Sequence, residues 1–477
     1  TDINTGLTNI IEQIIPEEEA NYFSQEEELE VYQTCIYLME EFIETHPTLI
    51  TEPDFDETFD ESIQQLMHSH FEGDIFYNDN AEEEMDEIIE HAKSDFFKYY
   101  IPLRSHPNTH ILKEPDTEFI EKRICSLTNR YQPVQRTKEW YEFRHKLITA
   151  SNAYKAFENP KVQNQLIYEK CQPLKQSLYV DNENDVSSDE DANKDITTIK
   201  EVAIKEVTMV NVNTTLHWGQ KYEPLSVKIY EHLYDTRIGD FGCIQHEKHL
   251  FLGASPDGIN IDKNSSRYGR MLEIKNIVNR EITGIPKKEY WIQTQLQMEV
   301  CDLDECDFLE TRFIEYPDYS SYLYDTSNEV YEDEDGTEFQ NVCLSNDCKM
   351  KGQFIYFHTK EGKPFYEYKP LDVIHPYDIE NWYEKTMNHY QNNPEFNYVF
   401  MKCIYWKLEE ISCVLIERNR LWFKSNISTL AELWNTVEKE RVSGYSHRAP
   451  NRKQKKDSMT IDLNGAKPVG GCLLQLI

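Results

Sequence analysis

The feature that most constrains the fold is a pair of short apolar segments separated by a turn and a polar loop. Residues 249–254 read His-Leu-Phe-Leu-Gly-Ala, a run typical of a buried strand, and Ser-Pro-Asp-Gly follows at residues 255–258 with turn chemistry. Polar residues 262–270 predict a loop, and residues 271–277 predict a second strand. Asp257 is therefore expected at a strand end, across a hairpin from the second strand.

The second predicted strand carries two charged residues on one face. Side chains alternate between the two faces of a strand, so Glu273 and Lys275 lie side by side, opposite Leu272 and Ile274. Burying such charges is costly unless they are paired or bind a metal. Asp257 is their natural partner across the hairpin.

This combination of residue types suits phosphodiester chemistry. Two carboxylates hold a hard divalent cation through oxygen ligands, and a nearby ammonium orients water and stabilises charge on a phosphate. Taken separately, Glu-x-Lys is more often a solvated ion pair and Pro-Asp-Gly an ordinary turn. Their order and spacing together favour a metal-dependent nuclease site.

Composition limits the class of protein. The chain has 477 residues with 39% hydrophobic content, which predicts a sizeable core and two or three domains. No apolar run approaches eighteen residues and no basic segment opens the chain, so neither a membrane span nor a secretory signal is expected. The 11 cysteines include no Cys-x-x-Cys, which predicts a reduced intracellular protein without an iron–sulfur cluster; the closest pairs are Cys301 with Cys306 and Cys343 with Cys348.

The net charge of −37 argues at first against nucleic acid as a partner. Its distribution removes most of that objection, because residues 1–125, 180–195 and 326–338 carry −26, −6 and −6, and the rest of the chain totals +1. The segment that contains the charged strand is close to neutral. It can therefore present a local basic groove.

The same shifts in composition predict three domains. Residues 1–125 are expected to form an acidic, mostly helical domain, with apolar residues at spacings of three and four between Leu29 and Ile43. Residues 126–320 are expected to form the core, with a disordered acidic insertion near residues 178–198.

Residues 321–477 are expected to form a C-terminal extension. The pattern predicts a hairpin over residues 354–368, helices over residues 378–390 and 427–440, and a basic tail over residues 441–456. That tail is a solvated linker or a segment that follows a phosphate backbone. The acidity of the first domain is a solvated helical face or, alternatively, a mimic of DNA charge that guards the groove or docks a basic partner.

Several short motifs stand in a fixed order between about residues 130 and 315. They are Gln-Arg-Thr-Lys-Glu-Trp at 135–140, Arg144, Ile-Thr-Ala-Ser at 148–151, Trp218-Gly219, Glu223-Pro224, Ser-Pro-Asp-Gly at 255–258, Glu-Ile-Lys at 273–275 and Gln-Leu-Gln at 295–297. In this order they resemble the lambda-exonuclease or YqaJ type of viral recombinase nuclease, within the PD-(D/E)XK superfamily. The two extensions resemble, more narrowly, those of a giant-virus nuclease of virophage resistance. The resemblance implies an α/β fold, with a restriction-endonuclease-like core in which helices flank a mixed central sheet.

The resemblance also implies a metal site. Asp257, Glu273 and the backbone carbonyl of Ile274 are expected to hold a divalent cation, Mg²⁺ by preference, with Mn²⁺ able to substitute. Lys275 is expected to position or activate the attacking water, with a pKa whose direction of shift the sequence leaves open.

Further roles fall on predicted helices. Glu223 is expected to complete a second metal position or orient water, and Gln295 to hydrogen-bond to the lysine or the water; without the resemblance, both indicate solvated or capped helix positions. Arg144 and Ser151 match the pair with which the family holds a terminal 5′-phosphate, although Ser151 also fits an ordinary helix N-cap. Trp140 is expected in the core rather than as a platform for a base.

These expectations combine into a Mg²⁺-dependent deoxyribonuclease, chiefly a 5′-to-3′ exonuclease on double-stranded DNA. An end-independent endonuclease is the alternative within the enzyme class. A catalytically dead DNA-binding or recruitment scaffold is the alternative outside it, and the presence of Asp257, Glu273 and Lys275 together argues against that reading. The bulky extensions favour a homodimer, or alternatively a monomer, over the ring trimer through which relatives thread DNA. No membrane partner is expected, and a viral protein would act in the host cytoplasm or virus factory.

Overall fold

The computed structural model describes residues 22–71, 79–106, 114–174, 212, 214–333 and 335–450. The acidic insertion predicted near residues 178–198 and the basic tail beyond residue 450 lie outside these residues. None of the described helices is long and apolar enough to cross a membrane.

Seven strands form the central sheet. The adjacent strands β6 (Met271–Asn276) and β7 (Glu305–Glu315) run parallel, with Glu273 opposite Phe308, and every other pair of neighbouring strands in this sheet is antiparallel. The expected α/β class with a mixed central sheet is therefore confirmed. In spatial order the strands are β11 (Pro364–Tyr368), β10 (Lys351–His358), β12 (Val399–Glu417), β7 (Glu305–Glu315), β6 (Met271–Asn276), β5 (Gly258–Asn260) and β2 (Ile238–Gly239).

Helices cover both faces of this sheet, and the alternation along β6 explains how. Leu272 and Ile274 cluster with Tyr230 of α9 (Thr215–Tyr234). Met271, on the opposite face, belongs to the main apolar core together with Ile292 of α10 (Lys288–Cys301). The face of β6 that carries Glu273 is consequently the one beside α10.

A small second sheet lies beside the central one. It contains β1 (Ile148–Thr149), β4 (Leu252–Ala254) and β3 (Ile244–Gln245), with β4 in the middle and parallel to β1. The strand predicted over residues 249–254 is shorter than expected, because residues 250–251 form a turn, closed by a hydrogen bond of 2.8 Å from the N–H of Leu252 to the carbonyl of His249. The chain leaves this sheet after Ala254 and enters the central sheet at Gly258.

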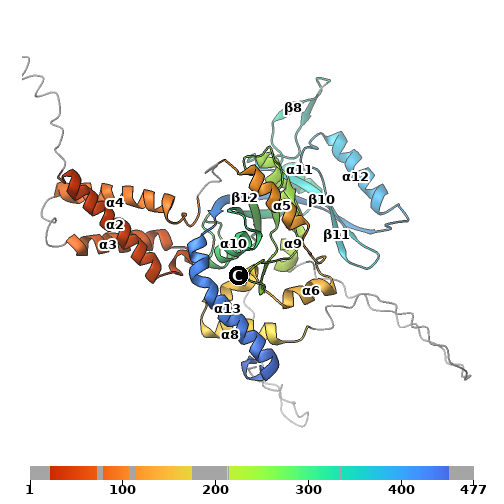
Figure 1. Ribbon diagram of the computed structural model, residues 1–477. Helices are drawn as coiled ribbons and strands as arrows, with labels where there is room; N and C mark the ends of the chain where they lie inside the picture. Colours follow the sequence, from red (N-terminus) through yellow and green to blue (C-terminus); the bar gives the residue numbers. More distant parts are fainter. Residues whose placement is uncertain are drawn as a thin grey trace, which may run out of the picture.

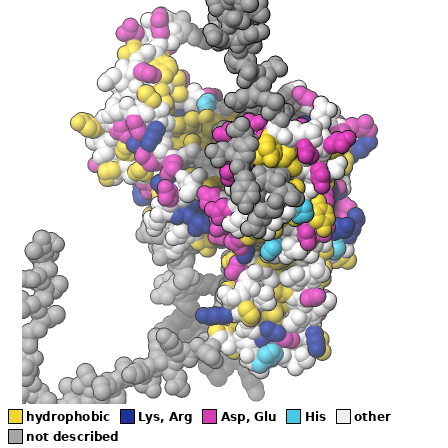
Figure 2. Space-filling view, turned by 90° about the vertical axis from the view of Figure 1, so that its left-hand side faces the viewer, with side chains coloured by type: hydrophobic (Ala, Val, Ile, Leu, Met, Phe, Trp, Pro, Cys, Tyr) yellow, Lys and Arg dark blue, Asp and Glu magenta, His cyan; other side chains and the backbone are white. Residues whose placement is uncertain are grey.

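Three acidic helices project from one side of the molecule (Figure 1). They are α2 (Gln25–Thr45), α3 (Phe55–Phe71) and α4 (Asp79–Tyr99), and α2 begins with a capping box between Ser24 and Glu27. In α2 the predicted residues Met39 and Ile43 are buried, whereas Leu29 is exposed. Asp and Glu side chains are spread over this side of the molecule (Figure 2).

The C-terminal residues complete the central sheet rather than forming a separate one. The predicted hairpin is confirmed as β10 and β11, with Phe357 opposite Phe365, and the predicted helices as α12 (Pro376–Tyr390) and α13 (Arg420–Ser443). Strand β12 pairs with β7 over residues 406–417, so the sheet takes strands from both sides of the boundary predicted at residue 320. The shorter helical elements are η1 (Leu49–Thr51), α5 (Thr117–Thr128), α6 (Lys138–His145), α7 (Ala150–Ala153), η2 (Tyr154–Phe157), α8 (Pro160–Cys171), α11 (Tyr319–Tyr324) and η4 (Ser446–Arg448).

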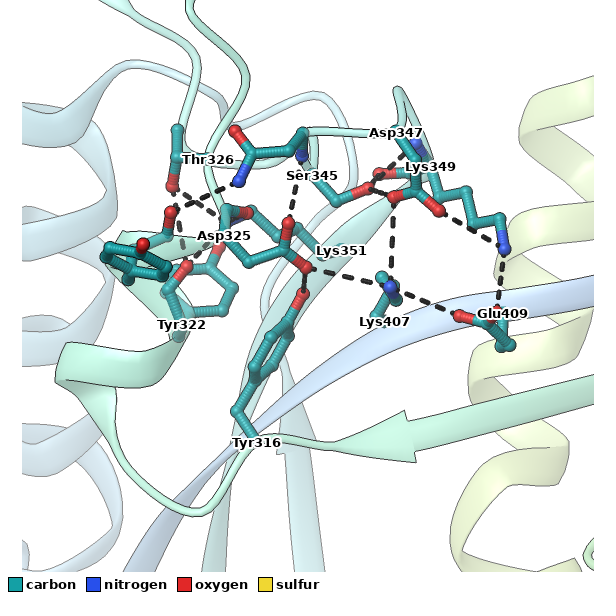
Figure 3. Close-up of polar contacts among 12 residues, drawn as sticks. Tyr316, Tyr322, Asp325, Thr326, Ser345, Asp347, Lys349, Lys351, Lys407 and Glu409 are labelled. Carbon is teal, nitrogen blue, oxygen red and sulfur yellow. Dashed lines mark hydrogen bonds and ion pairs between the residues drawn. The ribbon is translucent and has the colours of Figure 1, made fainter.

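The segment between β7 and β10 contains α11 and the hairpin of β8 (Val330–Glu332) and β9 (Glu338–Gln340). The buried Lys351 of β10 anchors this segment to the sheet. The ammonium of Lys351 donates to the carbonyl of Tyr322 at 2.6 Å, to Thr326 Oγ1 at 2.7 Å and to the carbonyl of Asp325 (Figure 3). Burial lowers the pKa of Lys351 to about 8. Two of these three hydrogen bonds satisfy backbone carbonyls at the end of α11.

Candidate active site

Asp257 lies where the chain passes from the small sheet to the central one. Its Oδ2 accepts a hydrogen bond of 2.7 Å from the backbone N–H of Ile274, which fixes the carboxylate beside β6, across the β5–β6 pair as expected. A Cβ on Gly258 would lie 2.1 Å from Cγ2 of Ile238. Glycine is therefore required in this motif by close packing against the edge strand.

Glu273 is buried, with 1% of its surface exposed, and its carboxylate is held by three donors. Nε2 of Gln293 donates to Oε1 and Nε2 of Gln297 donates to Oε2, both at 2.6 Å, and Lys275 pairs with Oε1. Because both oxygens are satisfied, the buried charge is stabilised. The sequence interpretation missed Gln293 and quoted Gln297 within its motif without giving it a role, although the helical spacing of four residues between them was a usable signal.

Lys275 is oriented by its surroundings as a charged group. Its Nζ lies 4.9 Å from the centre of the Tyr290 ring and 3.4 Å from Oε1 of Gln293. Burial opposes its charge, but the carboxylates of Glu273 and Asp257 outweigh that effect and raise the pKa of Lys275. The ammonium form suits the orientation of water and the stabilisation of negative charge.

Glu223 faces the same place from α9. With Asp257 and Asp240 it lines a cleft of about 720 Å³. Desolvation and the nearby charge of Glu273 raise the pKa of Glu223, and burial with the charges of Glu273 and Glu223 raises the pKa of Asp257 well above its usual range. The cleft therefore concentrates negative charge that its own cations do not neutralise.

Oxygen ligands with excess negative charge fit a hard divalent cation. Asp257 and Glu223 are the carboxylates with raised pKa values, which a bound cation would lower. Among the described residues, no three His, Cys, Asp or Glu side chains are already arranged as a metal-binding group, and the Glu273 oxygens accept from the donors described above. The residues of the site therefore fit a divalent cation by the chemistry of their oxygen donors and by their charge.

A second polar cluster adjoins this site. Nη1 of Arg144, in the last turn of α6, donates to Oγ of Ser255 at 3.2 Å, and Nε2 of Gln297 donates to the carbonyl of Ser255 at 3.3 Å as well as to Glu273. Ser255 thereby links Arg144 to the carboxylate cluster. The sequence interpretation quoted Ser255 within its motif but assigned it no role.

Ser151 lies at the exposed start of α7, two residues after the β1 residue Thr149, which is opposite Gly253 in the parallel β1–β4 pair. Ser255 likewise follows Gly253 by two residues, so the pairing brings both serines to the same end of the small sheet. The Ser151 hydroxyl lies 3.4 Å from Oγ1 of Thr149. Thr149, rather than Ser151, is the N-cap residue of α7.

Gln295 does not face the site. Its Nε2 donates to the carbonyl of Glu417 at 2.8 Å, and its Oε1 accepts from the N–H of Asn419 at 2.7 Å. The predicted contact of Gln295 with Lys275 is therefore wrong. On a helix, a residue two positions from Gln293 and from Gln297 points to the other side.

Trp140 is half-buried rather than a core residue. The guanidinium of Arg144 lies 4.5 Å from the centre of its ring, and Trp140 forms an edge contact with Tyr141 at 4.9 Å between ring centres. The ring therefore supports Arg144 through a cation–π contact.

Comparison with known proteins finds a family match over the segment that carries the site. Residues 139–304 match the YqaJ-like viral recombinase domain, so the resemblance read from the motifs is confirmed for this segment. An uncharacterized protein of Acanthamoeba polyphaga mimivirus is 31% identical over 242 residues, a match that covers 47% of this chain and 44% of that protein. The chain thus spans less than half the length of the curated relative it matches.

Two solved structures are similar at lower identity. The alkaline exonuclease of Laribacter hongkongensis matches with 16% identity and a TM-score of 0.30, over 64% of this chain and 95% of that one. The same enzyme in complex with dAMP matches with 17% identity and a TM-score of 0.31, over 64% and 98% of the two chains.

Proposed function

We propose that this chain, which carries a YqaJ-like viral recombinase domain over residues 139–304, is a metal-dependent deoxyribonuclease that degrades double-stranded DNA chiefly from 5′ to 3′. The observation that supports this most directly is the placement of Asp257 against the backbone of Ile274, beside the Glu273–Lys275 pair and facing the cleft that Glu223 lines. Carboxylates and an ammonium so placed suit phosphodiester hydrolysis.

The metal is proposed to be Mg²⁺, with Mn²⁺ as a substitute, held by Asp257, Glu223, Glu273 and the carbonyl of Ile274. When bound, such an ion polarises the phosphate and lowers the pKa of a coordinated water. Lys275 then orients the attacking water and stabilises charge that develops on the phosphate.

A 5′-phosphate is proposed to bind at Arg144, Ser151 and Ser255. The guanidinium and two hydroxyls supply donors of the kind that a phosphate dianion accepts. Because Gln297 contacts both Ser255 and Glu273, a terminal phosphate held here would lie close to the carboxylates. This is the basis for proposing preference for phosphorylated ends.

Nuclease assays on linear duplexes, with Mg²⁺ or Mn²⁺ and with or without a 5′-phosphate, test the proposal. Asp257→Asn and Lys275→Ala should each reduce cleavage by about 10²-fold or more. Arg144→Ala should remove the preference for phosphorylated ends. A wild-type protein no more active than Asp257→Asn would exclude the enzyme and favour the dead scaffold.

Circular DNA separates the two nuclease mechanisms. An exonuclease leaves a covalently closed circle intact, whereas an end-independent endonuclease cuts it as fast as linear DNA and is indifferent to Arg144→Ala. Equal cleavage of circular and linear substrates would overturn the exonuclease assignment.

The proposed setting is intracellular, in the cytoplasm or virus factory of a giant-virus host, with virophage DNA as one candidate target. The projecting acidic helices add bulk to one side of the molecule (Figure 1), and on that ground we propose a homodimer rather than a ring trimer. Light scattering after gel filtration measures the mass in solution, and a mass of three chains would contradict the dimer.

A further inference from the structure

Arg136 has a backbone conformation that favours glycine. Its φ is +66°, and it is the third residue of a turn closed by a hydrogen bond of 3.3 Å from the N–H of Thr137 to the carbonyl of Val134. Such strain in a residue with a side chain persists where the surrounding structure fixes it, and it concentrates at functional sites. The hydroxyl of Thr137 fixes the turn here, because it donates to the same carbonyl at 2.7 Å and accepts the N–H of Trp140 at 3.3 Å.

The turn forms one wall of the acidic cleft. Residues 132–135 line the cleft together with Glu223 and Asp257. Gln132 holds this wall in place, since its Nε2 donates to the carbonyl of Leu127 at 2.7 Å and its Oε1 accepts the N–H of Gly242 at 2.6 Å. Arg136 comes directly after this lining segment.

Arg136 is exposed and close to the cleft residues on α9. Desolvation and Glu273 raise the pKa of Glu223, and the charge of Arg136 offsets part of that rise. Burial and Lys221 lower the pKa of His217, and Arg136 adds to that fall. Both effects agree with the position of Arg136 directly after the segment 132–135, which lines the cleft together with Glu223 of α9.

In the part of the chain that the structure describes, Arg136 has no hydrogen-bond or ion-pair partner. Among the other cations near the carboxylates, Arg144 is engaged with Ser255 and Lys275 with Glu273, whereas Lys228 of α9 lines the cleft on the side of Glu223. A merely solvated arginine needs no left-handed backbone, and glycine would fit this turn with less strain. The strained backbone and the guanidinium, unpaired within the described residues, together indicate that Arg136 binds an anion from outside the chain.

Position along α6 identifies which anion. Arg144 lies in the last turn of α6 and Arg136 just before its first, so their backbones are about 12 Å apart along the helix axis. Both arginines adjoin the carboxylates, because Arg144 contacts Ser255, two residues before Asp257, and Arg136 follows directly on the segment 132–135 that lines the cleft with Glu223. We propose that Arg136 binds a backbone phosphate of the cleaved strand within three nucleotides on the 3′ side of the scissile phosphate. The inference rests on the proposed exonuclease function. In it, the arginines at the two ends of α6 bind two different phosphates of the same strand.

Binding of a 5′-phosphorylated duplex, measured by fluorescence anisotropy over a range of salt concentrations, tests this contact. Every variant also carries Asp257→Asn, which prevents cleavage during the measurement. Arg136→Gly relieves the backbone strain and should fold at least as well, yet bind about tenfold more weakly, with the slope of log affinity against log salt reduced by about 0.7 to 0.9. Arg136→Lys should retain part of the affinity, and Lys122→Gln, which removes an exposed charge on α5, should match the parent.

Duplexes with one neutral methylphosphonate locate the contact. At one of the first three phosphates 3′ of the scissile one, this change should weaken binding by the parent and add no further loss to Arg136→Gly. Losses that add at all three positions, or an Arg136→Gly variant with unchanged affinity and salt slope, would overturn the contact. A wild-type chain that cuts no DNA while Arg136→Gly still weakens binding would overturn the proposed hydrolysis and leave the contact standing.

Discussion

Two glutamines on α10 illustrate how much depends on single residues in this site. Gln293 and Gln297 are four positions apart and donate to the two oxygens of Glu273, while Gln295 between them donates to the carbonyl of Glu417 on the other side of the helix. Two of these three glutamines therefore hold Glu273 and the third holds the backbone at Glu417, because the helical period turns them to opposite sides of α10.

Gln297→Ala should lower the turnover number by about 10- to 100-fold, because groups that orient a metal-binding carboxylate have effects of that size. Gln295→Ala is the matched control. It should lower the free energy of unfolding by about 1–3 kcal/mol, since the N–H of Asn419 loses its acceptor, and leave turnover per folded molecule unchanged. Steady-state kinetics and urea unfolding measure both quantities; equal losses of turnover would contradict the division of tasks.

Asp257 makes the metal-free protein sensitive to pH. A carboxyl group whose pKa is raised by folding contributes fully to stability below its unfolded-state pKa, and that contribution is lost as pH rises through the folded-state pKa. Burial and the charges of Glu273 and Glu223 raise the pKa of Asp257, so the contribution of Asp257 to stability without metal should fall as pH rises from about 4.

Asp257→Asn keeps an acceptor for the N–H of Ile274 but removes the charge. It should stabilise the metal-free protein at pH 8 by about 1.4 kcal/mol for each unit of pKa shift, with little effect at pH 4. Thermal unfolding in EDTA at the two pH values measures the difference. A variant less stable than the wild type at pH 8 would show that the charge of Asp257 is compensated in some other way.

At the scale of elements, the passage from β4 to β5 positions the aspartate. Gly258 approaches Ile238 of β2 so closely that a Cβ would lie 2.1 Å from its Cγ2. Gly258→Ala should lower the free energy of unfolding by about 1–3 kcal/mol through overpacking, and it should reduce cleavage because β5 shifts together with Asp257.

The double variant Gly258→Ala with Ile238→Ala isolates this contact. If the clash is the cause, the double variant should be more stable than the sum of the two single changes predicts, as measured by urea unfolding. Strictly additive losses would mean that the glycine is required for some reason other than Ile238.

At the scale of the whole molecule, Arg104 connects the acidic helices to the core. Its buried Nη2 donates to the carbonyls of Thr51 at 3.1 Å and Pro286 at 2.5 Å, and its own carbonyl accepts Nε1 of Trp291 at 2.8 Å. Burial lowers the pKa of Arg104 to about 10. The apolar core is also continuous from Phe59 of α3 into the residues around α10.

Arg104→Ala should lower the free energy of unfolding by about 2–4 kcal/mol, because two buried carbonyls lose their donor and a cavity remains. Urea unfolding followed by tryptophan fluorescence measures this loss, with Lys122→Ala on the exposed face of α5 as a control that should be neutral. A loss within the range of the control would mean that the acidic helices do not depend on this connection.

The sequence by itself determined the local features of this protein. Strand alternation placed Glu273 and Lys275 on one face, the turn motif placed Asp257 at a strand end, and hydrophobic periodicity identified the hairpin and helices after residue 350. These are properties of neighbouring residues, which short-range periodicity encodes directly.

Tertiary structure alone decided the rest. It selected Gln293 and Gln297 over Gln295, joined Ser255 to Arg144 across 111 positions, and paired β12 with β7. Such contacts depend on how separate elements pack. The spacing of four places Gln293 and Gln297 on one face of α10, but it does not say that this face, rather than the face of Gln295, meets Glu273. The shifted pKa values of Asp257 and Lys275 arise in the same way, since burial and charge neighbours exist only in the folded chain.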